Sequence, residues 1–287
     1  MVIRITDNCG QHCLHCMQES GPDKKNFMDM ETYLKTLIFI KSTMTKVISI
    51  SGGEPTRHPD ILEYIQLAVS TKRVVVLLTN GDWVFDNPKL RDDLFILLLK
   101  NKNLSIQITS VRGVYTRYHS KTSIHDALRV RHTYNKVKKQ IVVVNKLELG
   151  ITPIGRAKDN TDKLMDKTFI TDRKAPRCFN PYSVVQNFSM IRDTINIVEV
   201  IDIIKIQTNS SLCIPMIKEN GDMVFGEYEA CNSVWNVSND STEVKIDDII
   251  GPCGSCFYSK TQKEVCDQYL GIFKNKYNKL DSDKELN

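Results

Sequence analysis

The sequence predicts an α/β protein in which parallel strands alternate with helices. Short runs rich in Val, Ile and Leu recur along the first 155 residues without strict alternation, as in parallel strands covered on both faces. Amphipathic stretches of helical length separate these runs. Because parallel neighbours need crossover connections, this order predicts a parallel sheet or a barrel.

The elements can be placed in chain order. We expect strands at Val2–Thr6, Val47–Ser51, Val74–Thr79, Leu104–Thr109, Ile141–Val144 and Leu147–Thr152. Helices are expected at about 29–42, 60–71, 88–100 and 123–138. Asp60, after the turn residue Pro59, is the expected N-cap of the second helix. Asn87 and Pro88 should open the third helix in the same way.

The character of the chain changes after "PIGRAKDN" at 153–160, where polar and turn-rich segments begin. We expect an α/β domain over 1–157 and a connecting region over 158–210. A small module of hairpins and loops should follow at 211–270, and then a polar tail at 271–287 that frays.

Composition excludes several classes of function. The 287 residues are 41% apolar and carry a net charge of +5 from mixed charges, which does not argue for nucleic-acid binding. The start "MVIRITDNCG" is no secretory signal, and the longest apolar run, "LFILLL" at 94–99, is too short to span a membrane. We therefore expect a cytoplasmic protein with neither nucleic acid nor membrane as partner. There, nine cysteines should be metal ligands, reactive thiols or core residues.

Three cysteines, Cys9, Cys13 and Cys16, stand in one short loop after the first strand. Thiolates suit zinc or iron–sulfur clusters. Three of them can hold three irons of a [4Fe–4S] cluster and leave the fourth iron open to a small molecule. A zinc site completed by His12 or His15 is the alternative. The loop alone leaves both interpretations open.

A second motif follows the second strand, where "KVISISGGEP" ends in Gly52, Gly53, Glu54 and Pro55. Two glycines let a backbone approach a ligand at the carboxyl end of a strand, where open α/β folds bind ligands. Glu54 adds an acceptor. The order of cysteine loop and glycine turn favours the cluster over zinc.

Together, these two motifs resemble the radical S-adenosylmethionine (radical SAM) superfamily over roughly residues 1–157. The resemblance implies a partial (β/α) barrel and a [4Fe–4S] cluster held by Cys9, Cys13 and Cys16. It implies that SAM chelates the open iron and that Gly52, Gly53, Glu54 and Pro55 receive its amino group. His15 takes the position of an aromatic residue that lies against the adenine. One electron from the reduced cluster would cleave SAM to methionine and a 5′-deoxyadenosyl radical, which takes a hydrogen atom from the substrate.

Later barrel segments resemble the family as well. Gln107 and Thr109 fall on one face of the fourth strand, where relatives place polar residues against the SAM ribose. Ser110, Val111 and Arg112 replace an aspartate that many relatives carry nearby. "TPIGRAKD" at 152–159 resembles a late barrel run, which implies that Arg156 contacts the SAM carboxylate or a substrate anion; packing on the barrel rim is the alternative. Thr79, Asn80 and Gly81 form either an ordinary turn or an approach to SAM or substrate.

A second cysteine group lies in the C-terminal part. "ENGDMV" predicts a β-hairpin that brings Cys213 and Cys231 together, and Cys253 and Cys256 form a pair of metal-binding spacing. Alone, four thiolates suit zinc equally well. The arrangement resembles the Twitch and SPASM domains, which implies one auxiliary [4Fe–4S] cluster on these four cysteines. Cys178 and Cys266 stay unassigned, either as spare thiols or as ligands of an incomplete second cluster.

These features lead to three functional hypotheses. The first is a radical SAM enzyme, oxidoreductase-like, that oxidatively modifies a ribosomally made peptide or protein and takes electrons from a flavodoxin or ferredoxin. The second is a radical SAM dehydrogenase of a small molecule such as a sugar alcohol. The third is a non-catalytic iron–sulfur or zinc protein that binds a partner; the glycine turn argues against it. No catalytic acid or base can be named from the sequence.

Overall fold

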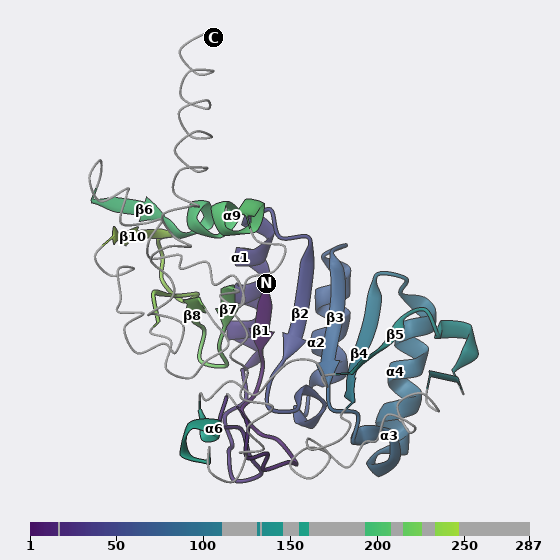
Figure 1. Ribbon diagram of the computed structural model, residues 1–287. Helices are drawn as coiled ribbons and strands as arrows, with labels where there is room; N and C mark the ends of the chain where they lie inside the picture. The colour runs from purple at the N-terminus through teal and green to yellow at the C-terminus, as the bar shows by residue number, and fades with distance from the viewer. Residues whose placement is uncertain are drawn as a thin grey trace.

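The computed structural model describes residues 1–16, 18–110, 131–132, 134–145, 155–160, 193–207, 215–225 and 233–246. Its main feature is one twisted sheet with the strand order β5-β4-β3-β2-β1-β7-β8-β9 (Figure 1). The strands are β1 (Val2–Arg4), β2 (Val47–Ser51), β3 (Val74–Thr79), β4 (Leu104–Ser110), β5 (Ile141–Asn145), β7 (Pro215–Ile217), β8 (Asp222–Phe225) and β9 (Trp235–Asn236). Strands β6 (Thr194–Asn196) and β10 (Glu243–Lys245) pair separately and antiparallel.

The strands from β5 to β7 are all parallel, whereas β8 and β9 are antiparallel to their neighbours. Within the described residues the sheet does not close on itself. The predicted α/β fold with a partial barrel is therefore confirmed. The segment expected to form the C-terminal module contributes β7, β8 and β9 to the same sheet, because β7 pairs with β1.

Helices connect the parallel strands. They are α1 (Met30–Ser42), η1 (Pro55–Arg57), α2 (Ile61–Ser70), α3 (Trp83–Asp86), α4 (Pro88–Lys100), η3 (Asn135–Val137), α6 (Arg156–Asp159) and α9 (Ile197–Gln207). In this part of the chain no helix is both long and apolar enough to cross a membrane.

Most predicted elements occur where the sequence places them. Strands β2 and β3 and helix α4 have the predicted bounds, and the other described elements of the parallel region differ at their ends by one or two residues. The strand expected at 147–152 lies outside the described residues, as does most of the helix expected at 123–138. Its last part contains the 3₁₀ turn η3 instead.

Of the two helix N-caps predicted from the sequence, one is formed by a side-chain hydrogen bond and the other is not. The Asn87 side chain accepts a hydrogen bond from the Leu90 N–H at 3.1 Å and caps α4, as expected. Asp60 stands at the N-cap of α2, but its side chain makes no cap hydrogen bond, which corrects the expectation. The backbone of Asp60 has φ −99° and ψ 21° rather than the extended conformation typical of an N-cap residue, and its N–H donates to His58 Nδ1 at 3.1 Å.

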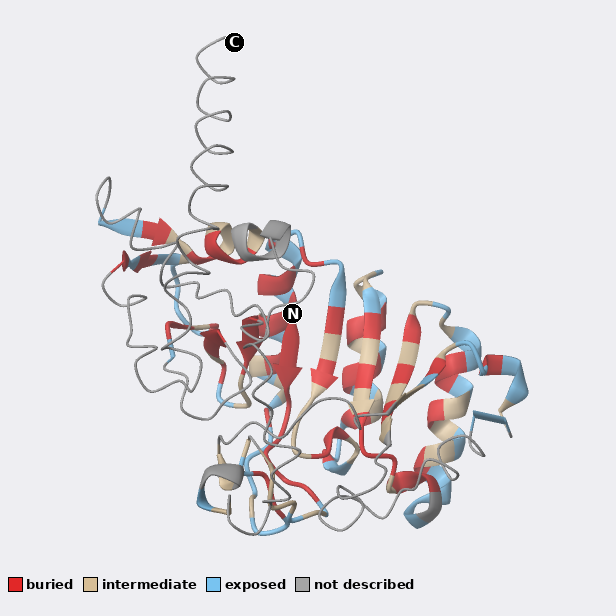
Figure 2. Cartoon of the chain, in the orientation of Figure 1, coloured by how far each residue is buried: buried red, intermediate tan, exposed pale blue. Residues whose placement is uncertain are grey.

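The sheet has two unlike faces. Buried and half-buried residues alternate along β2, β3 and β4 (Figure 2). The buried set packs against α1, α2 and α4 and forms the core with residues such as Ile50, Leu77 and Ile106. Tyr33 and Tyr64 stack inside it with ring centroids 4.0 Å apart. The half-buried set faces the other side, so that face is available for a ligand.

The predicted hairpin is present as β7 and β8. Its turn places Gly221 at φ +85°, in the left-handed region that favours glycine, and a Cβ there would lie 2.9 Å from Val237 Cγ2. Glu219 in this turn accepts hydrogen bonds from Arg4 Nε at 2.7 Å and Arg4 Nη2 at 2.9 Å. Because Arg4 belongs to β1 and is 1% exposed, the hairpin is fixed to the parallel sheet by a buried ion pair.

Candidate functional site

The cysteine loop leaves β1 and returns to α1 as a closed excursion at the carboxyl ends of the parallel strands (Figure 1). At its neck, the Met28 N–H donates to the Ile5 carbonyl at 2.8 Å. Farther along, the Cys9 N–H donates to the Gly21 carbonyl at 3.0 Å. These hydrogen bonds cross-link the backbone at both ends of the loop and hold the cysteines close to the end of β1.

The glycine turn packs directly against this loop. The Gly53 N–H donates to the Thr6 carbonyl and the Glu54 N–H to the Asn8 carbonyl, both at 2.8 Å. A Cβ on Gly52 would lie 2.7 Å from the Thr6 carbonyl oxygen, and one on Gly53 would lie 2.5 Å from that of Asn8. Both positions therefore need glycine so that the two motifs can touch.

Glu54 is fully engaged by its neighbours. Its carboxylate accepts hydrogen bonds from the Thr79 hydroxyl at 2.7 Å, the Thr56 hydroxyl at 2.6 Å and the Asn80 N–H at 2.7 Å. Burial raises the pKa of Glu54, and the hydrogen bonds from Thr56, Asn80 and Thr79 oppose this change. The side chain thus joins the glycine turn to the turn after β3.

Arg156 holds the cysteine loop from outside. Its backbone N–H donates to the Cys16 carbonyl at 3.0 Å. Its guanidinium donates to the Cys13 carbonyl at 2.8 Å and to the Ser20 carbonyl at 2.6 Å. The arginine is therefore a clamp on the loop backbone, and its positive charge lies close enough to Cys13 to oppose a rise in that thiol's pKa.

A cavity of about 310 Å³ opens between the loop and the half-buried face of the sheet. This volume is in the range of small-molecule sites, roughly 300–1,000 Å³. Most predicted site residues line it, namely Cys9, Cys13, His15, Cys16, Gly52, Gly53, Gln107 and Thr109. The predicted residues Glu54, Pro55 and Arg156 stand outside its lining. The auxiliary ligands Cys213, Cys231, Cys253 and Cys256, with Cys178 and Cys266, lie outside the described residues.

Sequence reasoning missed part of the lining. Gln11, Gln18, Ser20, Ser51 and Leu78 also face the cavity. Thr79 at the end of β3 and Asn80 after it line the cavity too, and the sequence allows these two as either a turn or an approach to SAM or substrate. The strand residues Ser51 and Leu78 could have been found from the alternation of faces along β2 and β3. Ser20 carries no such pattern, because it stands in a loop whose path the sequence does not specify.

The thiols sit in an environment that suits a metal cluster. Burial raises the pKa of Cys9 to about 12 and that of Cys13 to about 11, and neighbouring thiols add to both shifts. Bound cations supply the positive charge that stabilises the thiolates. The Gln11 N–H already donates to Cys9 Sγ at 3.4 Å.

The candidate donors are the three thiols of the cysteine loop, which line the same cavity as the glycine turn. In the part of the chain that the structure describes, no three His, Cys, Asp or Glu side chains converge on one metal position. A four-iron cluster requires no such convergence, since each thiolate binds its own iron. The three thiols, the glycine cradle and the cavity beside them fit a cluster with an adjacent small molecule.

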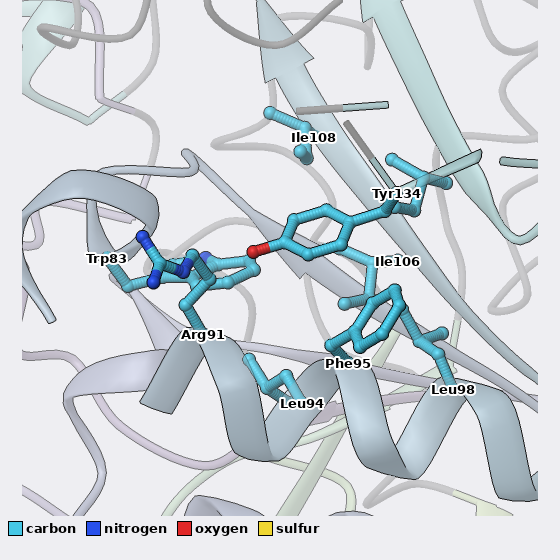
Figure 3. Close-up of a pocket in the computed structure, with 9 residues that line it drawn as sticks. Trp83, Arg91, Leu94, Phe95, Leu98, Ile106, Ile108 and Tyr134 are labelled. Atoms are coloured by element: carbon cyan, nitrogen blue, oxygen red, sulfur yellow. The ribbon is translucent and has the colours of Figure 1, made fainter. Parts of the chain in front are cut away.

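Two other cavities are less suited to this chemistry. One of about 620 Å³ lies on the other side of the loop, lined by Asn8, Gly10, Glu54, Arg57 and Asp82 among others. It contains none of the cysteines. The other, of about 10 Å³, is an apolar packing gap between α4, the sheet and Tyr134 (Figure 3). It has room for little more than one water molecule.

Comparison with known sequences agrees with this geometry. Residues 3–152 match the Radical SAM superfamily. The chain is 30% identical over 81 residues to the GTP 3′,8-cyclase of Chlorobaculum tepidum, which covers 28% of this chain and 24% of that protein. It is 30% identical over 77 residues to the subtilosin biosynthesis protein AlbA of Bacillus subtilis, covering 27% and 17%. The matched segments thus span a quarter or less of these relatives.

Solved structures share the fold. BtrN, crystallised with AdoMet and 2-DOIA, superposes with a TM-score of 0.53 at 14% identity over 94% of this chain and 88% of that chain. SuiB of Streptococcus suis, bound to S-adenosylmethionine, gives 0.50 at 14% identity over 91% and 67%. At such identities the likeness concerns the fold. The sequence match covers more than half of the 287 residues, so the chain belongs to the radical SAM superfamily.

Proposed function

We propose that this enzyme binds a [4Fe–4S] cluster through Cys9, Cys13 and Cys16 and cleaves SAM reductively to abstract a hydrogen atom from its substrate. Its superfamily uses such a cluster with SAM. The observation that carries the proposal is the 310 Å³ cavity, which joins the three thiols to the glycine turn and to the polar face of β4. When bound, the reduced cluster supplies one electron to SAM, which yields methionine and the 5′-deoxyadenosyl radical.

We assign different residues around the cavity to different parts of SAM. Because the Glu54 carboxylate is occupied by Thr56, Thr79 and Asn80, we assign the SAM amino group to backbone carbonyls of the turn that runs from Gly52 to Pro55. Glu54 then acts by fixing that turn. His15, Gln107 and Thr109 line the cavity; His15 would contact the adenine, and Gln107 and Thr109 would contact the ribose. Arg156 acts by holding the loop, since its guanidinium donates hydrogen bonds to two loop carbonyls.

An auxiliary [4Fe–4S] cluster on Cys213, Cys231, Cys253 and Cys256, as in a Twitch or SPASM domain, would complete an oxidation. Such a cluster, held by these four cysteines, would supply an acceptor for the one electron that a substrate radical gives up together with a proton to solvent, so the net change would be a two-electron oxidation. The hairpin of β7 and β8 supports this assignment, because Cys213 comes two residues before it. A flavodoxin or ferredoxin in the cytoplasm would supply the electrons.

For the substrate, we propose a ribosomally made peptide or protein. AlbA is named as a protein of bacteriocin biosynthesis, and it shares 30% identity over 77 residues with this chain. A small molecule is the second candidate. It is favoured by BtrN, crystallised with 2-DOIA, of which the chain covers 88% in the superposition.

The decisive experiment is anaerobic. The chain is reconstituted with iron and sulfide, its iron is counted, and dithionite and SAM are added before 5′-deoxyadenosine is measured by mass spectrometry. We expect about eight irons per chain, from two four-iron clusters, and formation of 5′-deoxyadenosine. Cys13→Ala should lower the count by about four and abolish the product.

Cys178→Ala is the matched control, since it removes a thiol that belongs to neither cysteine group. It should retain both iron and product. Tightly bound zinc without SAM cleavage in the wild-type protein would overturn the proposal. Incubation of the active enzyme with a candidate precursor peptide or an amino sugar alcohol, followed by product mass, separates the two substrate classes.

A further inference from the structure

One buried hydroxyl of the cavity has no role in the fold. Ser20 is 3% exposed and lines the 310 Å³ cavity beside the three cysteines. Within the described part of the chain, its Oγ has no hydrogen-bond partner. A buried hydroxyl without a partner is unfavourable, because it has lost its bonds to water and gained none in return.

The backbone fixes this hydroxyl in place. The Ser20 carbonyl accepts from the Arg156 guanidinium at 2.6 Å, and the next carbonyl, that of Gly21, accepts from the Cys9 N–H at 3.0 Å. The preceding residue, Glu19, has φ +52°, a left-handed conformation that is costly for a residue with a side chain. Ser20 is thus fixed to the same backbone as the cysteines. The residue before it, Glu19, has a backbone conformation that is unfavourable by itself.

We propose that the Ser20 hydroxyl donates a hydrogen bond to the loaded cofactor, at an anionic acceptor at the cysteine end of the cavity. This inference rests on the proposed function. Two acceptors there share the required chemistry, namely a sulfur atom of the cluster and the carboxylate of SAM. Ser20 is accordingly a cofactor-binding residue, and the bond to the cofactor would satisfy its buried hydroxyl.

Ser20→Ala tests the proposal with three readouts on the full chain. In the unloaded protein the variant should melt at the same or a higher temperature, since it loses only an unpartnered polar atom. After reconstitution, a bond to cluster sulfur appears as a lower midpoint potential without SAM. The expected tenfold shift in the reduction equilibrium equals about 59 mV for one electron. A bond to SAM appears as an unchanged potential and about tenfold weaker SAM binding by equilibrium dialysis.

The control is Ser70→Ala, whose hydroxyl donates to the Leu67 carbonyl at 2.7 Å at the exposed end of α2. It should leave potential and SAM binding unchanged. Full iron content in Ser20→Ala with unaltered potential and SAM affinity would overturn this inference and leave the proposed function standing. A variant that melts lower would overturn it too, because the hydroxyl would then have a structural partner. A wild-type chain that takes up no cluster would overturn both.

Discussion

Gly53 shows how closely the glycine turn and the cysteine loop approach each other. A Cβ at this position would lie 2.5 Å from one loop carbonyl oxygen and 2.7 Å from the next, so the backbone would have to move. We predict that Gly53→Ala destabilises the protein by about 1–3 kcal/mol, the usual cost of overpacking. Urea unfolding measures this change, and cluster content after reconstitution should fall with it.

Gly10→Ala provides the comparison within the same loop. The added Cβ would meet only the end of the Arg57 side chain, at 3.2 Å, and that side chain can shift. We expect a change within about 0.5 kcal/mol. Equal losses in the two variants would show that close packing is not the reason for glycine at position 53.

His58 makes stability depend on pH. Its Nε2 bonds to the Met28 carbonyl at 2.8 Å, and its Nδ1 accepts from the Asp60 N–H at 3.1 Å, so the ring is neutral in the fold. Burial lowers the pKa of His58. The unfolded chain therefore binds a proton more readily, and stability that is present above about pH 6.5 is lost as the pH falls below it.

We predict that His58→Gln, which keeps a donor and an acceptor, flattens this dependence. Urea unfolding at pH 7.5 and 5.5 should show a smaller loss than in the wild-type protein. His132→Gln, at an exposed position, should behave like the wild type. An equal loss in His58→Gln and wild type would exclude His58 as the source.

Residues whose role is local could be predicted from the sequence. The spacing of the cysteines and the glycine pair indicated one site, and Gln107 and Thr109 shared a face because strand side chains alternate. Arg156 is different, since its partners Cys13 and Ser20 lie 143 and 136 residues away. No pattern of spacing reveals such contacts. The same is true of the bonds that Glu54 accepts from Thr79 and Asn80 at the end of β3.

Two helix caps look alike in the sequence and differ in the structure. Asn87 bonds to the Leu90 N–H, whereas the Asp60 side chain makes no cap bond. We predict that Asn87→Ala lowers the free energy of unfolding by about 1 kcal/mol. Asp60→Ala should cost about 0.5 kcal/mol or less, from the helix dipole alone. Urea midpoints for both variants test the difference, and an equal cost would show that the Asp60 carboxylate caps α2 after all.

Elements as such were well predicted, because hydrophobic runs and turn residues mark them within a few positions. What failed was the detail at element ends, where a neighbouring 3₁₀ turn redirected the chain before α2. The strict alternation of burial along β2, β3 and β4 was also missed. In β3 the sequence shows apolar residues on both faces, whereas β2 and β4 carry Ser, Gln or Thr on the half-buried face; only the assembled sheet shows that this face borders a cavity.

At the scale of the whole molecule, the Arg4–Glu219 pair joins segments 215 residues apart. Its two side chains are 2% and 11% exposed. We predict that Glu219→Gln, which removes the negative charge of this buried pair, lowers the free energy of unfolding by about 3 kcal/mol. Hydrogen exchange in β7 and β8 should increase, because the hairpin loses its ionic link to β1 and keeps only the backbone pairing of β7 with β1.

The double change Arg4→Met with Glu219→Leu is the matched test. Apolar residues of similar size often replace a buried pair without loss, so the double variant should recover most of the stability. If it is as unstable as Glu219→Gln, the charges contribute more than their mutual compensation. The sequence indicated the hairpin but not its place beside β1, because strand pairing at this separation leaves no local trace.

The contact of Arg156 with the cysteine loop affects when, during translation, that loop can take its final shape. The cysteines leave the ribosome 143 residues before the arginine that fixes their loop. At 5–20 residues per second this interval lasts roughly 7 to 29 s. During that time the nascent chain displays three thiols without the contact that shapes their loop. Iron insertion into the correctly formed loop is therefore a late event, after strands β1 to β5 have been translated.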